Sequence, residues 1–211
     1  MRSFSQLQQD IEVLKYYDYK DNGYFVEIGA SDGIELSNTY LLETEYNWKG
    51  ICVEPIPERY DLLLTNRPKS ICSNKAIYNK SNLSLLFDIS NECDLFSGLS
   101  AYIDCHKHIV EKDKKQINVS TISLNDLLDE SNCPQFIDYL SLDTEGSELE
   151  ILKSVDLDKY VFGLIDVEHN FIEPRRTQIR ELLCSNGYEY VRPNNFDDSY
   201  KHKSVSYTAN V

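Results

Sequence analysis

The segment YFVEIGASDG, residues 24–33, decides how this chain is expected to fold. Its first half, Tyr24 to Ile28, is a short run of apolar and β-favouring side chains, which is typical of a strand buried in a sheet. Two glycines follow, at Gly29 and Gly33, and glycine allows the positive φ angles and close backbone approach of a tight turn. The segment therefore predicts a buried strand that ends in a turn able to lie against a ligand.

The same alternation of strand and helix continues along the chain. Further strands are expected at residues 50–54, 70–73, 83–89, 116–122, 136–142, 161–167 and 188–191, with an edge strand at about 203–207. Helices are expected at about 3–18, 37–46, 57–66, 101–112, 124–130, 147–154 and 174–185. Strands that alternate with helices of this length predict a doubly wound α/β fold, in which helices cover both faces of a mostly parallel sheet.

The composition limits the class of protein and its partners. With 211 residues, 41% of them hydrophobic, we expect a single domain over residues 1–211, with its core over about 23–211. The net charge of −14 repels phosphate backbones and argues against a nucleic-acid partner. No apolar run approaches the length of a bilayer-spanning helix, so we expect no membrane insertion. The early position of the first motif leaves room for other domains of a longer chain.

The cysteine pattern bears on the compartment and on metal binding. The six cysteines include no Cys-x-x-Cys pair, and no secretory signal opens the chain, which together predict reduced thiols and a cytoplasmic location. The run Cys105-His106-Lys107-His108 offers side chains that bind metals. A zinc site needs a second pair of ligands at suitable spacing, and the sequence lacks one. We therefore expect no metal at this run.

Polar segments directly follow four of the predicted strands. These segments are Glu27 to Gly33, Glu54-Pro55, Asp143 to Gly146 and Glu168 to Asn170. In an open α/β sheet the ligand crevice lies at the carboxyl ends of the strands, where the strand order reverses. We therefore expect the four segments to meet in one crevice.

The acids in these segments indicate the kind of ligand. The first loop matches neither the G-x-G-x-x-G pattern nor a P-loop, and Glu27 and Asp32 suit a ligand with positive charge and hydroxyls better than a phosphate. Glu54 lies 21 positions after Gly33, close to the offset at which an acid binds both ribose hydroxyls in dinucleotide folds. The alternatives are a merely structural turn for the first loop and a helix-dipole partner for Glu54.

Four ordered strings carry a family resemblance. FVEIGASDGIELSNTYLLE (25–43), WKGICVEPIPERY (48–60), IDYLSLDTEGSELEIL (137–152) and VEHN (167–170) resemble the FkbM family of S-adenosylmethionine (SAM)-dependent methyltransferases, and the likeness runs from about Ser5 to Tyr200. The resemblance implies the Rossmann-like class I methyltransferase fold, with a mostly parallel seven-stranded sheet and an antiparallel edge strand. It implies SAM as cofactor and S-adenosylhomocysteine as product.

The resemblance also implies roles for individual residues. The residues expected around the methionine moiety are Glu27, Gly29, Ala30, Ser31, Asp32 and Gly33, with Ser37, Asn38 and Asp143 close to them. Glu54 is expected at the ribose, Pro55 and Ile56 beside the adenine, and Asn74, Lys75 and Ala76 at its edge. Ser97-Gly98-Leu99 resembles a family loop over the active site. Family members mostly methylate oxygen atoms, often on sugars, so a sugar or glycan acceptor is expected.

Methyl transfer to a hydroxyl makes a general base useful. The acceptor oxygen must lie in line with the carbon–sulfur bond of the cofactor, and a base that removes its proton can add roughly 10²–10⁴-fold to the rate. Asp143 and His169 are the candidate catalytic residues, because each follows a buried strand and histidine is in general a side chain suited to act as a base near neutral pH. The alternative for His169 is a structural support of the loop at Glu168.

A metal is a competing interpretation of the same strand ends. Asp143, Glu168 and His169 are hard or borderline donors that could hold Mg²⁺ or Mn²⁺ against the acceptor. Some sugar O-methyltransferases that the chain resembles more distantly use such a metal. Here Glu-His replaces their usual pair of acids, which counts against it. Glu145 and Glu148 are expected to be acids at a helix start.

Three other functions compete with a sugar O-methyltransferase. A nicotinamide dehydrogenase is disfavoured by the acidic first loop and its missing glycine. A methyltransferase acting on a protein or another small molecule is an alternative within the class. A non-catalytic module of a glycan-assembly complex is disfavoured, because such a module has no need for buried carboxylates at all four strand ends.

Overall fold

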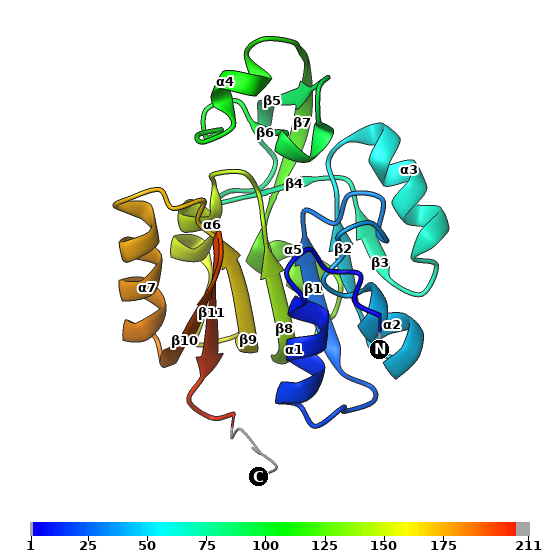
Figure 1. Ribbon diagram of the computed structural model, residues 1–211, viewed down its shortest axis with the longest axis vertical. Helices are drawn as coiled ribbons and strands as arrows, with labels where there is room; N and C mark the ends of the chain where they lie inside the picture. The colour runs from blue at the N-terminus through cyan, green and yellow to red at the C-terminus, as the bar shows by residue number, and fades with distance from the viewer. Residues whose placement is uncertain (1, 206–211) are drawn as a thin grey trace.

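The computed structural model describes residues 2–205, and its centre is a seven-stranded sheet (Figure 1). The strand order is β10-β11-β9-β8-β1-β2-β3. The strands are β1 (Tyr24–Ile28), β2 (Lys49–Val53), β3 (Ile71–Ser73), β8 (Phe136–Leu142), β9 (Val161–Glu168), β10 (Tyr188–Asn194) and β11 (Asp197–His202). Neighbouring strands from β3 to β9 are parallel, whereas β11 pairs antiparallel with both β9 and β10 at one side of the sheet. The predicted fold class is confirmed.

Helices cover both faces of this sheet because its side chains alternate between the two faces. On one face Phe25, Cys52, Tyr139 and Leu164 pack against α1 (Gln9–Tyr16), α2 (Tyr40–Tyr46) and α3 (Pro57–Asn66). On the other face Val26, Ile51, Leu140 and Ile165 pack against α5 (Leu124–Glu130), α6 (Glu148–Ser154) and α7 (Arg175–Ser185). Both faces of the buried strands therefore contribute to the hydrophobic core.

Two terminal elements differ from the sequence prediction. The helix expected over 3–18 is shorter, because Gln8 has a φ of 63° and interrupts it, and Ser5 Oγ accepts the Asp10 N–H from outside the helix. The prediction of an edge strand at 203–207 is wrong for residues 203–205, which follow β11 as a turn. Residues 206–207 lie outside the described residues. The antiparallel strand is instead β11, whose first residues Asp197 and Asp198 are buried and hydrogen-bonded rather than apolar.

Residues 76–123 form an insertion with a sheet of its own. Its strands are β4 (Ala76–Tyr78), β5 (Ser84–Ser90), β6 (Gly98–Leu99) and β7 (Lys114–Ser123), in the order β4-β7-β5-β6, with η1 (Asp94–Phe96) and α4 (Lys107–Val110). In Figure 1 it stands above the carboxyl ends of the main strands. The helix expected over 101–112 is reduced to α4, because Asp104 and His106 are engaged with Arg175 and Glu145 of the main domain.

Candidate active site

A cleft opens between the carboxyl ends of the main strands and the insertion. All four predicted strand-end segments reach it. The predicted site residues that line it are Glu27, Gly29, Ala30, Ser31, Ser37, Asn38, Glu54, Pro55, Ile56, Ala76, Asp143 and Glu168. The insertion contributes the opposite wall through Phe87, Leu95, Phe96, Ser97, Leu99 and His106. The fold thus brings the acids of four separate strands into one place.

The first loop is held in shape by its glycine. Gly29 has a φ of +88°, and a Cβ atom there would lie 2.3 Å from the backbone oxygen of Asp143. Only glycine allows this conformation and this approach without strain. The loops after β1 and β8 therefore run side by side at the floor of the cleft.

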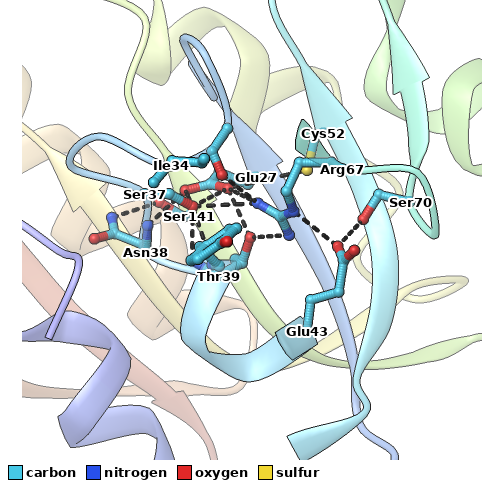
Figure 2. Close-up of polar contacts among 12 residues, drawn as sticks. Glu27, Ile34, Ser37, Asn38, Thr39, Glu43, Cys52, Arg67, Ser70 and Ser141 are labelled. Atoms are coloured by element: carbon cyan, nitrogen blue, oxygen red, sulfur yellow. Dashed lines mark hydrogen bonds and ion pairs between the residues drawn. The ribbon is translucent and has the colours of Figure 1, made fainter. Parts of the chain in front are cut away.

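Glu27 fixes the first loop through a saturated carboxylate (Figure 2). Its oxygens accept hydrogen bonds from Ser37 Oγ at 2.9 Å, from the Asn38 N–H at 2.6 Å and from Thr39 Oγ1 at 2.6 Å. The guanidinium of Arg67 adds an ion pair at 3.4 Å. Glu27 is only 3% exposed. Its lone pairs are therefore directed mainly at the protein itself, and its main action is to position residues 29–39.

Arg67 is a residue of this site that sequence reasoning missed. It is fully buried, pairs with Glu43 at 2.7 Å as well as with Glu27, and donates to the carbonyl of Gly33 at 3.2 Å (Figure 2). In the sequence it is one more cation after a predicted helix, which is an ordinary surface position. Only the fold shows that its side chain enters the core.

Five predicted site residues lie elsewhere. The carboxylate of Asp32 accepts the backbone N–H groups of Ile34 and Glu35, which makes it part of a turn outside the cleft. The predicted site residues that do not line the cleft are Asp32, Gly33, Asn74, Lys75 and His169. Lys75 forms an ion pair with Glu130 at 3.7 Å. The geometry therefore gives these residues no direct place in a cofactor site.

Glu54 connects the first two strand ends. Its carboxylate oxygens accept the backbone N–H groups of Ser31 at 3.0 Å and Ile56 at 2.8 Å. Burial raises the pKa of Glu54 to about 7, although both of these hydrogen bonds oppose that rise. Each carboxylate oxygen can accept a further hydrogen bond, so Glu54 retains capacity for hydroxyl donors in the cleft.

Three carboxyl groups lie close together at one point of the cleft. Oxygen atoms of Asp143, Glu145 and Glu168 all lie within 4.8 Å of one another. Burial, followed by repulsion from Glu148, raises the pKa of Asp143 to about 6. Burial and repulsion from Asp143 raise the pKa of Glu145 to about 9 and that of Glu168 well above its ordinary value. The cluster therefore favours a proton or a cationic ligand.

Glu145 and Glu148, both expected as acids at a helix start, differ in their contacts. Glu148 Oε1 accepts the backbone N–H groups of Thr144 and Gly146, so it shapes the turn before α6 as expected. Glu145 does not complement the helix in this way. Its φ of 57° turns it out of helical geometry, and its side chain enters the cleft.

His169 is a correction to the sequence prediction. Its side chain is 1% exposed, and its Nε2 lies 3.5 Å from the carboxylate of Asp198. Its Nδ1 accepts the Phe171 N–H at 2.9 Å. Asp198 is in turn paired with Arg176 and Arg180 of α7. The imidazole therefore supports the loop after β9, and its position does not suit a base in the cleft.

The orientation of His169 is inconsistent with the predicted group of metal ligands. Asp143 and Glu168 lie together, but His169 points away from them toward Asp198. The donors at this point are then carboxylates only, with Glu145 in place of a histidine. The predicted Mg²⁺ or Mn²⁺ site at Asp143, Glu168 and His169 is not supported.

Most of the ionisable side chains that line the cleft are acidic. The acids that line it are Glu27, Glu35, Glu54, Asp94, Asp143, Glu145, Asp166, Glu168 and Asp197. Arg59 is the arginine among the lining residues, and Asp94 neutralises it at 2.6 Å. Such a lining attracts a cationic ligand and repels phosphate.

The fold and the cleft together define a class I, Rossmann-like methyltransferase. A model of the methyltransferase FkbM domain matches residues 27–190, and the chain belongs to this family. Membership of this SAM-dependent methyltransferase family implies SAM as the cofactor.

Solved structures agree on the fold. Precorrin-6y C5,15-methyltransferase from Geobacter metallireducens GS-15 matches with a TM-score of 0.50 at 12% identity, covering 92% of this chain and 86% of that one. The METTL16 MTase domain matches with a TM-score of 0.53 at 12% identity, covering 93% of this chain and 66% of that one. At this identity the likeness concerns the fold alone. No curated protein matches the sequence.

Proposed function

We propose that this protein is an O-methyltransferase that transfers the methyl group of SAM to a hydroxyl of a sugar or glycan. The observation that carries the proposal is the cluster of Asp143, Glu145 and Glu168 beside the glycine loop. It combines a preference for a cationic sulfonium with groups able to accept hydrogen bonds from a hydroxyl.

The cofactor fits along the row of strand ends. Ala30, Ser31, Ser37 and Asn38 would hold the methionine part, and the free capacity of Glu54 suits the ribose hydroxyls. Pro55, Ile56 and Ala76 offer an apolar wall for the adenine. Bound SAM supplies an activated methyl group, and the residues around it orient the acceptor and exclude water.

Asp143 is the proposed catalytic residue on the main sheet. It follows β8 and opens into the cleft, and its pKa of about 6 leaves it largely ionised at neutral pH. An ionised Asp143 would accept a hydrogen bond from a hydroxyl of the acceptor and hold the acceptor toward the methyl group. Such positioning contributes several kcal/mol to a displacement reaction.

The charge of the cleft supports a neutral acceptor. The lining acids and the net charge of −14 disfavour phosphorylated substrates, nucleic acids included. Methylation of a protein or another small molecule is the alternative. All six cysteines are free thiols, which supports a reducing, cytoplasm-like compartment. No helix within residues 2–205 combines the length and apolar character of a bilayer crossing.

The test is methyl transfer to defined sugars. The protein is incubated with SAM and the methyl glycosides of glucose, galactose, rhamnose and fucose, with and without EDTA, and products are analysed by mass spectrometry. We expect a gain of one methylene unit on at least one glycoside, unaffected by EDTA, and loss of turnover in Asp143→Asn with S-adenosylhomocysteine binding retained. Binding of NADH in place of S-adenosylhomocysteine, or no transfer to any glycoside, would contradict the proposal.

A further inference from the structure

We propose that His106, in the loop before α4, is the catalytic base that receives the proton of the acceptor hydroxyl, and that Glu145 orients its imidazole. This inference rests on the proposed function, because it assigns a residue to the acceptor side of the same cleft. It replaces His169 with a histidine of the run Cys105 to His108, for which the sequence predicted no catalytic role.

Three contacts fix the imidazole of His106 at the cleft wall. The Sγ of Cys105 lies 3.3 Å from its Nδ1. The same Nδ1 lies 2.9 Å from a carboxylate oxygen of Glu145. Its ring stacks on Phe96 with centroids 3.8 Å apart and an angle of 15° between the planes. The side chain retains 24% exposure and lines the cleft. Because Glu145 engages Nδ1, Nε2 is the atom left for the acceptor.

No other histidine can take this role. His106 lines the cleft, whereas His108, His169 and His202 do not. His108 Nδ1 is bonded to the carbonyl of Cys105, and the His169 ring is enclosed against Asp198. His202 is bonded to Ser204 and is the last residue of β11, whereas the first residue of that strand, Asp197, is the one that lines the cleft. The insertion therefore carries the one imidazole that faces the cofactor loops.

The surroundings keep His106 able to accept a proton. Burial lowers its pKa, the carboxylate of Asp104 opposes that shift, and His108 adds to it. The groups facing it from other elements are Phe96 of η1 and Glu145 of the loop after β8. A sulfonium in the cleft favours the ionised form of its carboxyl groups, so Glu145 can then accept the Nδ1–H and later stabilise an imidazolium.

The proposed step balances in atoms and charge. The acceptor oxygen bonds to the methyl carbon while the carbon–sulfur bond breaks, and the electron pair of that bond stays on sulfur. The hydroxyl proton passes to Nε2 of His106, and the imidazolium releases it to water after the product leaves. The acceptor would therefore lie between Asp143 on the main sheet and His106 on the insertion.

The test compares two neighbouring histidines. His106→Gln removes the base, and His108→Gln makes the same change at an exposed position outside the cleft. We measure kcat and KM on the methyl glycosides that the wild type methylates, and the Kd of S-adenosylhomocysteine by calorimetry. We expect His106→Gln to lower kcat by about 10²–10⁴-fold, with Kd within twofold, and His108→Gln to change neither.

The pH profile separates a base from a structural support. Protonation of His106 and of Asp143 both lower the wild-type rate at acid pH, and in His106→Gln the acid limb should become shallower because one titration is missing. Three results with His106→Gln would overturn this inference while leaving the proposed function standing. They are a kcat within threefold of the wild type, an acid limb of the pH–rate profile as steep as that of the wild type, and a loss of affinity for S-adenosylhomocysteine. If the wild type methylates no glycoside, the proposed function and this inference fail together.

Discussion

Two groups of acids in this protein differ in what surrounds them. Glu27 and Glu43 lie in the network around Arg67, where hydroxyl, amide and guanidinium donors satisfy their oxygens (Figure 2). Asp143, Glu145 and Glu168 lie together, and within the described residues no lysine or arginine forms an ion pair with them. One oxygen of Glu168 has no partner. A carboxylate whose hydrogen bonds are satisfied stabilises the fold. Carboxyl groups that repel one another reduce the stability of the fold, so their presence indicates a functional site.

Removal of Arg67 should have the largest effect on stability. Arg67→Met would leave Glu27 and Glu43 buried without their cation, and breaking such a buried pair costs about 3–5 kcal/mol. Urea unfolding followed by circular dichroism measures the loss. Arg192→Met, which breaks the exposed pair with Glu12 at 3.4 Å, is the matched control and should cost about 1 kcal/mol or less. Equal losses in the two variants would show that the Arg67 network is not a structural core.

Two glutamates around the same loop should respond in opposite ways. Glu148→Gln weakens the hydrogen bonds that its side chain accepts from the N–H groups of Thr144 and Gly146. This change should lower the free energy of unfolding by about 1–3 kcal/mol. Glu168→Gln removes a repelling carboxyl and should leave the unfolding free energy unchanged or slightly raised at neutral pH. Thermal and urea unfolding of both variants test this difference. A loss in Glu168→Gln as large as that in Glu148→Gln would remove the distinction between the two groups of acids.

The stability of the ligand-free protein should fall as the pH rises. Burial raises the folded-state pKa values of Asp143 to about 6, Glu54 to about 7, Asp197 to about 8 and Glu145 to about 9. A raised folded pKa means that the folded state binds more protons than the unfolded state, so stability is lost as pH rises through these values. We expect Tm to fall between pH 5 and 9 and SAM to reduce that fall. A Tm that rises over this range would contradict the assigned shifts.

Much of the site can be predicted from the sequence, because the sequence shows where the buried strands end. Apolar runs ending at Ile28, Val53 and Leu142 determine which polar residues come next, and a parallel sheet brings those residues to one edge. The direction in which a side chain points is harder to predict from the sequence. Asn170 and Phe171 have φ values of 47° and 57°, and with Asp198 they turn the ring of His169 out of the cleft.

Long-range contacts set the remaining limits of sequence prediction. Glu145 and His106 are 39 positions apart, and neither segment alone indicates their pairing. Arg67 follows a surface helix, yet it reaches Glu27 in the core. Asp197 and Asp198 lack the apolar pattern of a strand because their partners come from distant segments, Gln9 and Arg176.

The central claim is that the unsatisfied carboxyl cluster exists for the positive sulfur of the cofactor. Calorimetric Kd values of SAM and S-adenosylhomocysteine, for the wild type and for Glu168→Gln, test it most directly, because the two ligands differ in that charge. The account predicts that Glu168→Gln weakens SAM about three- to tenfold more than S-adenosylhomocysteine, a difference of roughly 1 kcal/mol. Equal weakening of both ligands, or no effect on either, would contradict it.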